Sequence, residues 1–275
     1  MPKSGGNRPA ARGGDFPLRG RHAAVTGASR GIGAAIADAL ARLGADVTLL
    51  ARDEELLRRR AEEINGRTGQ GGRARTARLD VTDEASVEAA FGAAVQQGGA
   101  VSILVNCSGV AGSVPFHRME VAHWREALDT NLTGTFLCTR QVYPAMRDAG
   151  WGRIVNIAST AGLAGYPYIA AYTASKHGVV GLTRALALEA AKTGVTVNAV
   201  CPGYTETEMV RRTIENIAAK TGRSEEEALQ QIAANNPQGR LIQPEEVAGA
   251  VSWLCLPGAD SVTGQSIVIA GGEVM

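Results

Sequence analysis

Short apolar segments alternate with helix-like segments along almost the whole chain, and this alternation limits the fold more than any other feature. Seven apolar segments rich in Val, Ile and Leu lie at 22–27, 46–51, 77–81, 101–106, 153–159, 195–200 and 266–271. The helix-like segments lie at 33–43, 53–65, 83–97, 121–147, 171–192 and 244–256. Continuous apolar runs indicate strands buried on both faces, and strands that alternate with helices form parallel sheets with right-handed crossovers. The sequence therefore predicts an α/β fold with a doubly wound, seven-stranded parallel sheet and helices on both faces.

The chain divides into a short tail and one domain. Residues 1–17 are rich in Gly, Pro and Arg without an apolar run, which predicts a flexible basic tail rather than a secretory signal. Residues 18–275 contain neither a linker nor an internal repeat. Residues 204–240 interrupt the alternation after the sixth strand, where open α/β sheets bind ligands, and we interpret them as a substrate lid. A structural or subunit-contact role is the alternative. Ser224 and Glu227 have capping-box spacing, which predicts that a helix starts there.

Charge and cysteine content argue against several classes of protein. The chain has 28 Lys and Arg against 27 Asp and Glu, so no overall basic charge favours nucleic acid as a partner. No apolar run reaches the roughly 18–20 residues of a membrane helix. The four cysteines are scattered, which indicates buried free thiols and a reducing cytoplasm. His117 and His123 have a spacing that suits no common metal pair, and no metal is predicted.

A glycine-rich turn follows the first predicted strand. Thr26–Gly33 reads TGASRGIG, and a helix-like segment follows it directly. Gly27, Gly31 and Gly33 allow a tight turn in which backbone N–H groups approach a phosphate, and the helix offers its positive N-terminus to the same anion. In this position the turn predicts a Rossmann-type dinucleotide site.

The end of the second strand bears on the choice of dinucleotide. An NAD site usually has a carboxylate there, whereas this chain has Arg52 followed by Asp53. A guanidinium pairs with the 2′-phosphate of NADP, and Arg30 in the glycine turn is expected to reach the same phosphate. We therefore expect NADP(H) to be preferred, with NAD(H) possible if Asp53 binds the ribose instead.

Three side chains form a candidate catalytic group. Tyr172 and Lys176 are four residues apart in a long helix-like segment and share one face. A phenol is a poor acid or base at neutral pH, and a nearby ammonium is expected to lower its pKa. The preceding strand brings Ser159 to its carboxyl edge, where a hydroxyl can stabilise charge on a carbonyl oxygen.

Together these motifs resemble the classical short-chain dehydrogenase/reductase superfamily over residues 18–275, which implies one dinucleotide-binding and catalytic domain. The motifs that carry the resemblance are Thr26–Gly33, Asn106–Gly109, Asn131, Ser159, Tyr172 with Lys176, and Pro202-Gly203. The chain is most similar to 3-oxoacyl-thioester reductases, polyketide ketoreductases and 3-hydroxyacyl-CoA and 3-hydroxybutyrate dehydrogenases. It departs from the usual Asn-Asn-Ala-Gly at Cys107 and Ser108, which are small enough to preserve the strand edge. We interpret Cys107 as a structural thiol.

The resemblance implies a role for each motif. Tyr172 would be the general acid or base, Lys176 would tune it and hold the nicotinamide ribose, Ser159 would bind the carbonyl, and Asn131 would hold a water of the proton relay. Asp80, with the Val81 backbone, would contact the adenine. The implied cofactor-binding residues are Gly27, Ser29, Arg30, Gly31, Ile32, Gly33, Arg52, Asp80, Val81, Asn106, Tyr172, Lys176, Pro202, Gly203, Thr205 and Thr207.

These expectations describe an NADPH-dependent oxidoreductase that reduces the ketone of a 3-oxoacyl thioester or polyketide-like substrate, carried on coenzyme A or an acyl carrier protein. A dehydrogenase that oxidises secondary alcohols or 3-hydroxyacyl-CoA is the alternative, and a catalytically silent cofactor-binding sensor is a minor one. Arg211 and Arg212 could meet phosphates of a carrier arm, although a solvated pair is the simpler interpretation. The resemblance also implies a homotetramer, while the cysteine usage, the charge balance and the lack of a long apolar run predict a cytoplasmic protein without membrane or nucleic-acid partners.

Overall fold

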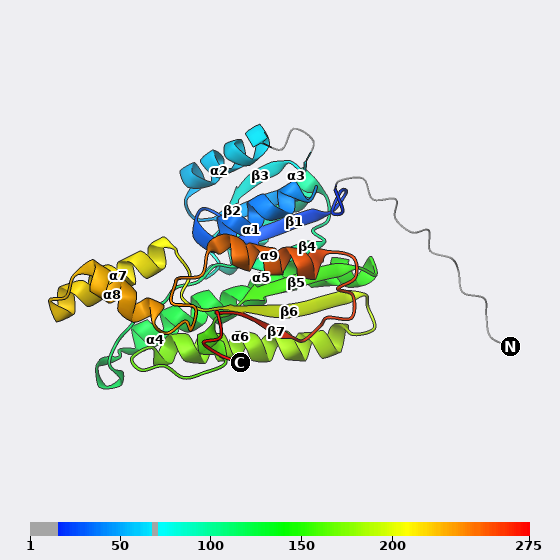
Figure 1. Cartoon of the computed structure of the whole chain (residues 1–275). Helices are drawn as coiled ribbons and strands as arrows, with labels where there is room; N and C mark the ends of the chain where they lie inside the picture. Colours follow the sequence, from blue (N-terminus) through cyan, green and yellow to red (C-terminus); the bar gives the residue numbers. More distant parts are fainter. Residues whose placement is uncertain (1–15, 68–70) are drawn as a thin grey trace.

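Seven parallel strands form one sheet at the centre of the molecule (Figure 1). The computed structural model describes residues 16–67 and 71–275. The strands are β1 His22–Thr26, β2 Asp46–Ala51, β3 Ala74–Arg78, β4 Ile103–Asn106, β5 Gly152–Ile157, β6 Val195–Pro202 and β7 Ser266–Ile269. Their spatial order is β3-β2-β1-β4-β5-β6-β7, which confirms the predicted doubly wound sheet. The predicted N-terminal tail lies almost entirely outside the described residues.

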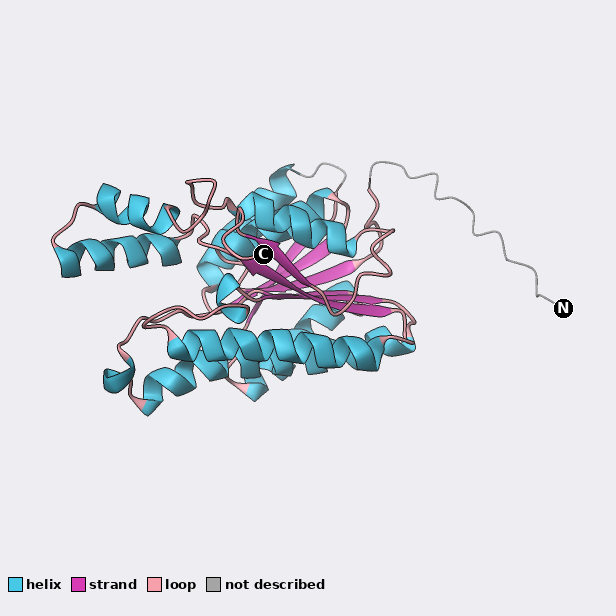
Figure 2. Ribbon diagram, turned by 60° about the horizontal axis from the view of Figure 1, so that its bottom comes forward, coloured by secondary structure: helices cyan, strands magenta, loops and turns pink. Residues whose placement is uncertain are grey.

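Helices cover both faces of the sheet (Figure 2). They are α1 Gly31–Arg42, α2 Glu54–Arg67, α3 Glu84–Gly98, α4 Val121–Leu128, α5 Gly134–Asp148, α6 Ala170–Ala190, α7 Glu208–Thr221, α8 Glu225–Ala233 and α9 Pro244–Cys255. One core lies between the sheet and α1, α2 and α9, and the other between the sheet and α3, α5 and α6. Strands β1, β4, β5 and β6 are buried along their whole length, which explains their continuous apolar runs.

Two predicted elements are wrong in their boundaries. The strand expected at 77–81 is β3 Ala74–Arg78, an edge strand of mixed burial. Leu79 and Val81 lie in the loop after β3 and are buried in the second core, so the apolar run continues beyond the end of the strand. The helix expected at 121–147 is interrupted by a π-helical segment, η2 Asp129–Thr133, between α4 and α5. The other predicted strands end within two residues of the observed ones.

The insertion at 204–240 forms α7 and α8, which project from one end of the molecule (Figure 1). They have a small core of their own, formed by Val210, Ile214, Ala228 and Ile232. The capping box predicted at Ser224 is confirmed, because Ser224 Oγ accepts a bond from the Glu227 N–H at 3.2 Å and Glu227 Oε2 accepts one from the Ser224 N–H at 2.8 Å. Among the described residues, no helix is both long and apolar enough to cross a membrane.

Candidate functional site

The carboxyl ends of β1 and β4 define the centre of the site. These strands are neighbours in the sheet, and the chain leaves them toward opposite faces, which is where open α/β sheets bind ligands. We call the region above the carboxyl ends of the central strands the crevice. Thr26 closes the base of that crevice, because its buried Oγ1 accepts bonds from the N–H groups of Cys107 at 2.9 Å and Ser108 at 3.0 Å. Gly27 lies directly above, where a Cβ would stand 3.0 Å from the Cys107 carbonyl oxygen. Thr26 was recognised in the sequence only as the start of a motif, and its side chain ties two strand ends together.

The glycine turn has the geometry that a pyrophosphate requires. Gly31 has a φ of +57°, in the left-handed region that favours glycine. A Cβ on Gly33 would stand 2.3 Å from the Gly27 carbonyl oxygen, so no other residue fits there without a backbone shift. No side chain caps the N-terminus of α1, and its first turn holds no acidic residue. Its N–H groups are therefore available to an anion, and these residues fit the dinucleotide that the sequence predicted.

The two arginines proposed to read a 2′-phosphate lie in different environments. Arg52 follows β2, is exposed, and has no carboxylate within ion-pair distance among the described residues. Asp53 instead caps α2, with its Oδ1 accepting a bond from the Leu56 N–H at 3.0 Å. Arg30 is paired with Glu208 at the start of α7 rather than directed toward Arg52. Both partners of that ion pair are about half exposed, at 50% and 44%, so it is weak and a phosphate can compete for Arg30.

The side chains of two residues expected to contact the adenosine, Asp80 and Asn106, already form hydrogen bonds within the protein. Asp80 Oδ1 accepts bonds from the Thr82 N–H at 3.0 Å and the Thr82 hydroxyl at 2.7 Å, and these bonds hold the pKa of Asp80 below its usual value. The buried Asn106 side chain donates to Thr139 Oγ1 at 3.0 Å and to Asn156 Oδ1 at 2.8 Å. The side chain of Asn106 therefore joins the end of β4 to β5 and α5.

Ser159, Tyr172 and Lys176 come together at the carboxyl end of β5. Ser159 follows the strand, and its Oγ accepts a bond from the Ala161 N–H at 3.1 Å, which leaves the hydroxyl proton free to be donated. Tyr172 and Lys176 lie one turn apart on α6, with Lys176 Nζ 5.7 Å from the centre of the phenol ring. Lys176 is buried, and Nζ donates to the Ile157 carbonyl at 2.8 Å.

Burial controls the acidity of this group. It raises the pKa of Tyr172, while a hydrogen bond with Ser159 acts in the opposite direction. It also lowers the pKa of Lys176 to about 8. The sequence argument expected the ammonium to lower the phenol pKa; in the folded protein, desolvation of the phenolate is the larger influence.

Asn131 joins this group through the π-helical segment η2. Its Oδ1 accepts a bond from the Val110 N–H at 2.8 Å, and its Nδ2 donates to the Val110 carbonyl at 3.0 Å and to Ser175 Oγ at 2.9 Å. A Cβ on Gly109 would lie 3.2 Å from Asn131 Oδ1 and 3.7 Å from Lys176 Nζ, so this glycine gives both side chains room. π-Helical turns recur at functional sites, and the sequence carried no sign of this one.

The start of the predicted lid lies beside the glycine turn. Thr207 is the N-cap of α7, and its Cγ2 would be 3.1 Å from a Cβ on Gly31. Thr205 Oγ1 donates to the Gly203 carbonyl at 3.0 Å and braces the Pro202-Gly203 turn. The segment 202–207 thus bridges the crevice from β6 toward α1. The lid residues Arg211 and Arg212 pair with Glu206 and Glu208, which favours the interpretation of a solvated charge pair.

Cys107 is not an activated nucleophile. Burial raises the pKa of its thiol to about 12, so it is protonated at neutral pH. The other three cysteines are buried free thiols, as predicted.

Among the described residues, no cluster of three metal-ligating side chains is present.

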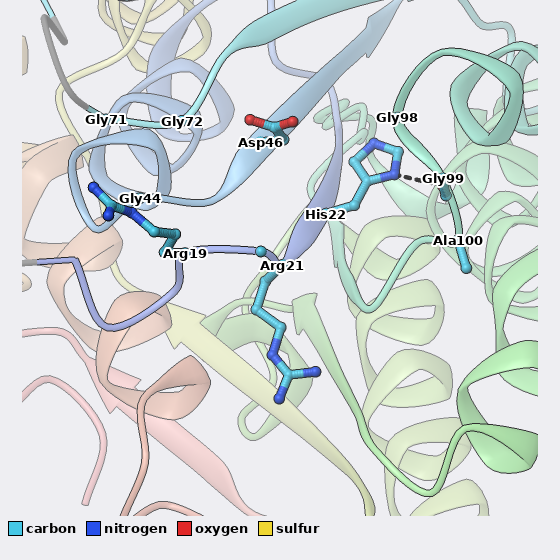
Figure 3. A pocket seen from close by; sticks show the side chains of 11 residues that line it. Arg19, Arg21, His22, Gly44, Asp46, Gly71, Gly72, Gly98, Gly99 and Ala100 are labelled. Atoms are coloured by element: carbon cyan, nitrogen blue, oxygen red, sulfur yellow. Dashed lines mark hydrogen bonds between the residues drawn. The ribbon is translucent and has the colours of Figure 1, made fainter. Parts of the chain in front are cut away.

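A separate cavity of about 490 Å³ lies at the amino ends of β1 and β2, away from this site (Figure 3). His22 lines the cavity, and its ring contacts the Gly99 carbonyl at 2.8 Å and Thr48 Oγ1 at 2.8 Å. Arg21 stacks on Trp151, 3.5 Å from the ring centre. We assign no function to this cavity.

The doubly wound parallel sheet with its glycine-rich turn after β1 defines a Rossmann-type dinucleotide-binding fold. The family model described as short chain dehydrogenase matches residues 21–218. The chain therefore belongs to the short-chain dehydrogenase family.

Similar proteins in this family include several reductases. One is a Streptomyces violaceoruber protein named, provisionally, as ketoacyl reductase 1 of the granaticin polyketide synthase; it is 46% identical over 91% of this chain and 92% of its own length. The 3-oxoacyl-acyl-carrier-protein reductase of Vibrio cholerae is 38% identical over 94% of this chain and 99% of its own. A crystal structure of a variant actinorhodin polyketide ketoreductase with NADPH has a TM-score of 0.87 at 45% identity, covering 92% of this chain and 97% of that one.

Proposed function

We propose that this protein is an NADPH-dependent ketoreductase that acts on a 3-oxoacyl thioester or polyketide-like ketone. The observation that carries the proposal is the convergence of Asn131, Ser159, Tyr172 and Lys176 beside a glycine turn with a free helix N-terminus. The similarity to a ketoacyl reductase of a polyketide synthase and to a 3-oxoacyl-acyl-carrier-protein reductase supports the substrate class.

The proposed cofactor contacts follow from the positions of the side chains. The N–H groups of the turn, including those of Ser29, Gly31 and Ile32, would hold the pyrophosphate, and Arg52 would pair with the 2′-phosphate together with Arg30. Asp80, Val81 and Asn106 would line the adenosine side. Pro202, Gly203, Thr205 and Thr207 would line the nicotinamide side.

When bound, NADPH supplies the hydride to the carbonyl carbon of the substrate. Ser159 donates a hydrogen bond to the carbonyl oxygen as negative charge develops there. Tyr172 donates its proton to that oxygen, a role that suits a phenol whose pKa is raised by burial. Lys176 keeps positive charge near the phenol. Together with a water held by Asn131, it would return a proton to Tyr172 after each reduction.

The proposal extends to the assembly. The adjoining helices α4, α5 and α6 present exposed apolar side chains at Val121, Trp124, Phe136 and Leu188, which favours a homo-oligomer, with a tetramer expected from the family. The segment 204–240 would act as the substrate lid in a cytoplasmic enzyme. Coenzyme A or an acyl carrier protein would carry the acyl group.

The test is steady-state reduction of acetoacetyl-CoA, followed at the nicotinamide absorbance with NADPH and NADH in parallel. Strong turnover that depends on NADPH is expected. If no ketone is reduced with either cofactor, and bulky cyclic ketones and polyketide mimics fail as well as acetoacetyl-CoA, the proposed reaction is overturned. Efficient NAD-dependent oxidation of secondary alcohols in the same assay would favour the dehydrogenase alternative.

A further inference from the structure

A carboxylate from the C-terminal segment lies in the catalytic crevice. After β7, Gly271 with φ +60° and Gly272 with φ +97° turn the chain back toward the carboxyl edge of the sheet. The next residue, Glu273, packs against Gly203, with Oε2 2.7 Å from the place where a Cβ on that glycine would stand. Glu273 thus lies beside the turn that we propose to line the nicotinamide.

Two hydroxyl groups hold one oxygen of this carboxylate. Tyr166 OH donates to Glu273 Oε1 at 2.6 Å, and Thr160 Oγ1 donates to the same oxygen at 3.5 Å. Thr160 directly follows Ser159, so the carboxylate is linked to the turn that carries the carbonyl-binding hydroxyl. The second oxygen, Oε2, is enclosed and has no hydrogen-bond partner among the described residues.

The part of the chain that the structure describes places no cation against this carboxylate. In residues 16–67 and 71–275, no Lys, Arg or His nitrogen lies within ion-pair distance of Glu273. Its charge acts on a neighbouring side chain: burial raises the pKa of Tyr204, which follows Gly203, and the charge of Glu273 raises it further. An unbalanced negative charge in a partly desolvated crevice acts on any ligand that enters it.

We propose that Glu273 determines substrate specificity by charge, disfavouring ketones that carry a free carboxylate beside the reacting carbonyl and so selecting neutral acyl derivatives such as thioesters and esters. The proposal rests on the ketoreductase function proposed above. A free 3-oxo acid has its carboxylate one carbon away from the ketone, which brings a second negative charge into the crevice. A thioester or ester has the same skeleton without that charge. Like charges brought together in a binding site are strongly unfavourable, so the neutral form is favoured.

The test compares ethyl acetoacetate with acetoacetate, which share one ketone and differ in charge. The value of kcat/KM with NADPH is measured for both in the wild type, in Glu273→Gln and in Glu88→Gln. The wild type is expected to prefer the ester, and Glu273→Gln to reduce that preference by about tenfold or more, mainly through a lower KM for acetoacetate. Glu88→Gln removes an equal charge from an exposed position on α3 and should leave the preference unchanged.

Each other outcome has a defined meaning. An ester preference within threefold of wild type in Glu273→Gln, with NADPH affinity by nucleotide fluorescence retained, would overturn the inference alone. A wild type that reduces acetoacetyl-CoA but neither of these two compounds would overturn this inference alone, because the neutral ester is then not accepted. A wild type that also fails with acetoacetyl-CoA, cyclic ketones and polyketide mimics would overturn the proposed function and this inference with it. Glu273→Leu removes the charge and the hydrogen bonds together, and must also reduce the preference. An ester preference that falls in Glu273→Gln but not in Glu273→Leu would contradict a charge effect.

Discussion

Replacing Thr26 by Val tests whether the crevice depends on one buried hydroxyl. The side chains have nearly the same shape, but Val removes the oxygen that accepts the N–H groups of Cys107 and Ser108 at 2.9 and 3.0 Å. Thr26 is 1% exposed, so water has little access to its side chain. Both N–H groups would therefore lose their partner at the point where β1 and β4 separate.

The expected cost follows from these two bonds. A buried donor left without a partner costs about 1–3 kcal/mol. Because Cys107 and Ser108 are only half-buried, the lower value applies to each, which gives about 2 kcal/mol for the pair. In a chain of this size that corresponds to a decrease in Tm of about 4–8 °C. The affinity for NADPH should fall as well, because the same bonds hold the glycine turn against β4.

The assay is thermal and urea unfolding of both proteins, with NADPH affinity measured by nucleotide fluorescence. Thr196→Val is the matched control, since Thr196 is also buried in a strand but its side chain makes no hydrogen bond with the described residues. The control should change the free energy of unfolding by less than about 0.5 kcal/mol. If Thr26→Val changes the free energy of unfolding as little as the control does, the role assigned to this hydroxyl is refuted.

Three further outcomes are expected. Tyr172→Phe should abolish ketone reduction and leave NADPH affinity nearly unchanged, because only the proton donor is lost; activity within tenfold of wild type, measured at saturating NADPH, would contradict the assignment. Arg52→Asp should shift the ratio of kcat/KM for NADPH over NADH toward NADH by about tenfold or more; an unchanged ratio would mean that Arg30 or another group reads the 2′-phosphate. The pKa of Lys176 is lowered to about 8, so it loses its proton as the pH rises through that value. Reduction rates should therefore fall above about pH 8, and a profile flat to pH 10 would exclude Lys176 as the controlling group.

The sequence by itself determined the order of elements and most of the site. Continuous apolar runs predicted six strands to within two residues at each end, because burial on both faces leaves a local signature. Glycine spacing at Gly27, Gly31 and Gly33 and the one-turn spacing of Tyr172 and Lys176 are also local properties. The boundary of β3 was predicted wrongly because Leu79 and Val81 are buried by a loop, and burial alone does not distinguish a loop from a strand.

Only the tertiary structure decided the contacts that join distant segments. Thr26 meets Cys107 across 81 positions, Arg30 meets Glu208 across 178, and Tyr166 meets Glu273 across 107. The π-helical segment that carries Asn131 likewise has no local signature. Such contacts depend on which strands become neighbours and where their ends meet, and periodicity along the chain carries no information about that. The direction in which burial shifts the acidity of Tyr172 and Lys176 was decided in the same way, by the side chains that the fold packs around them.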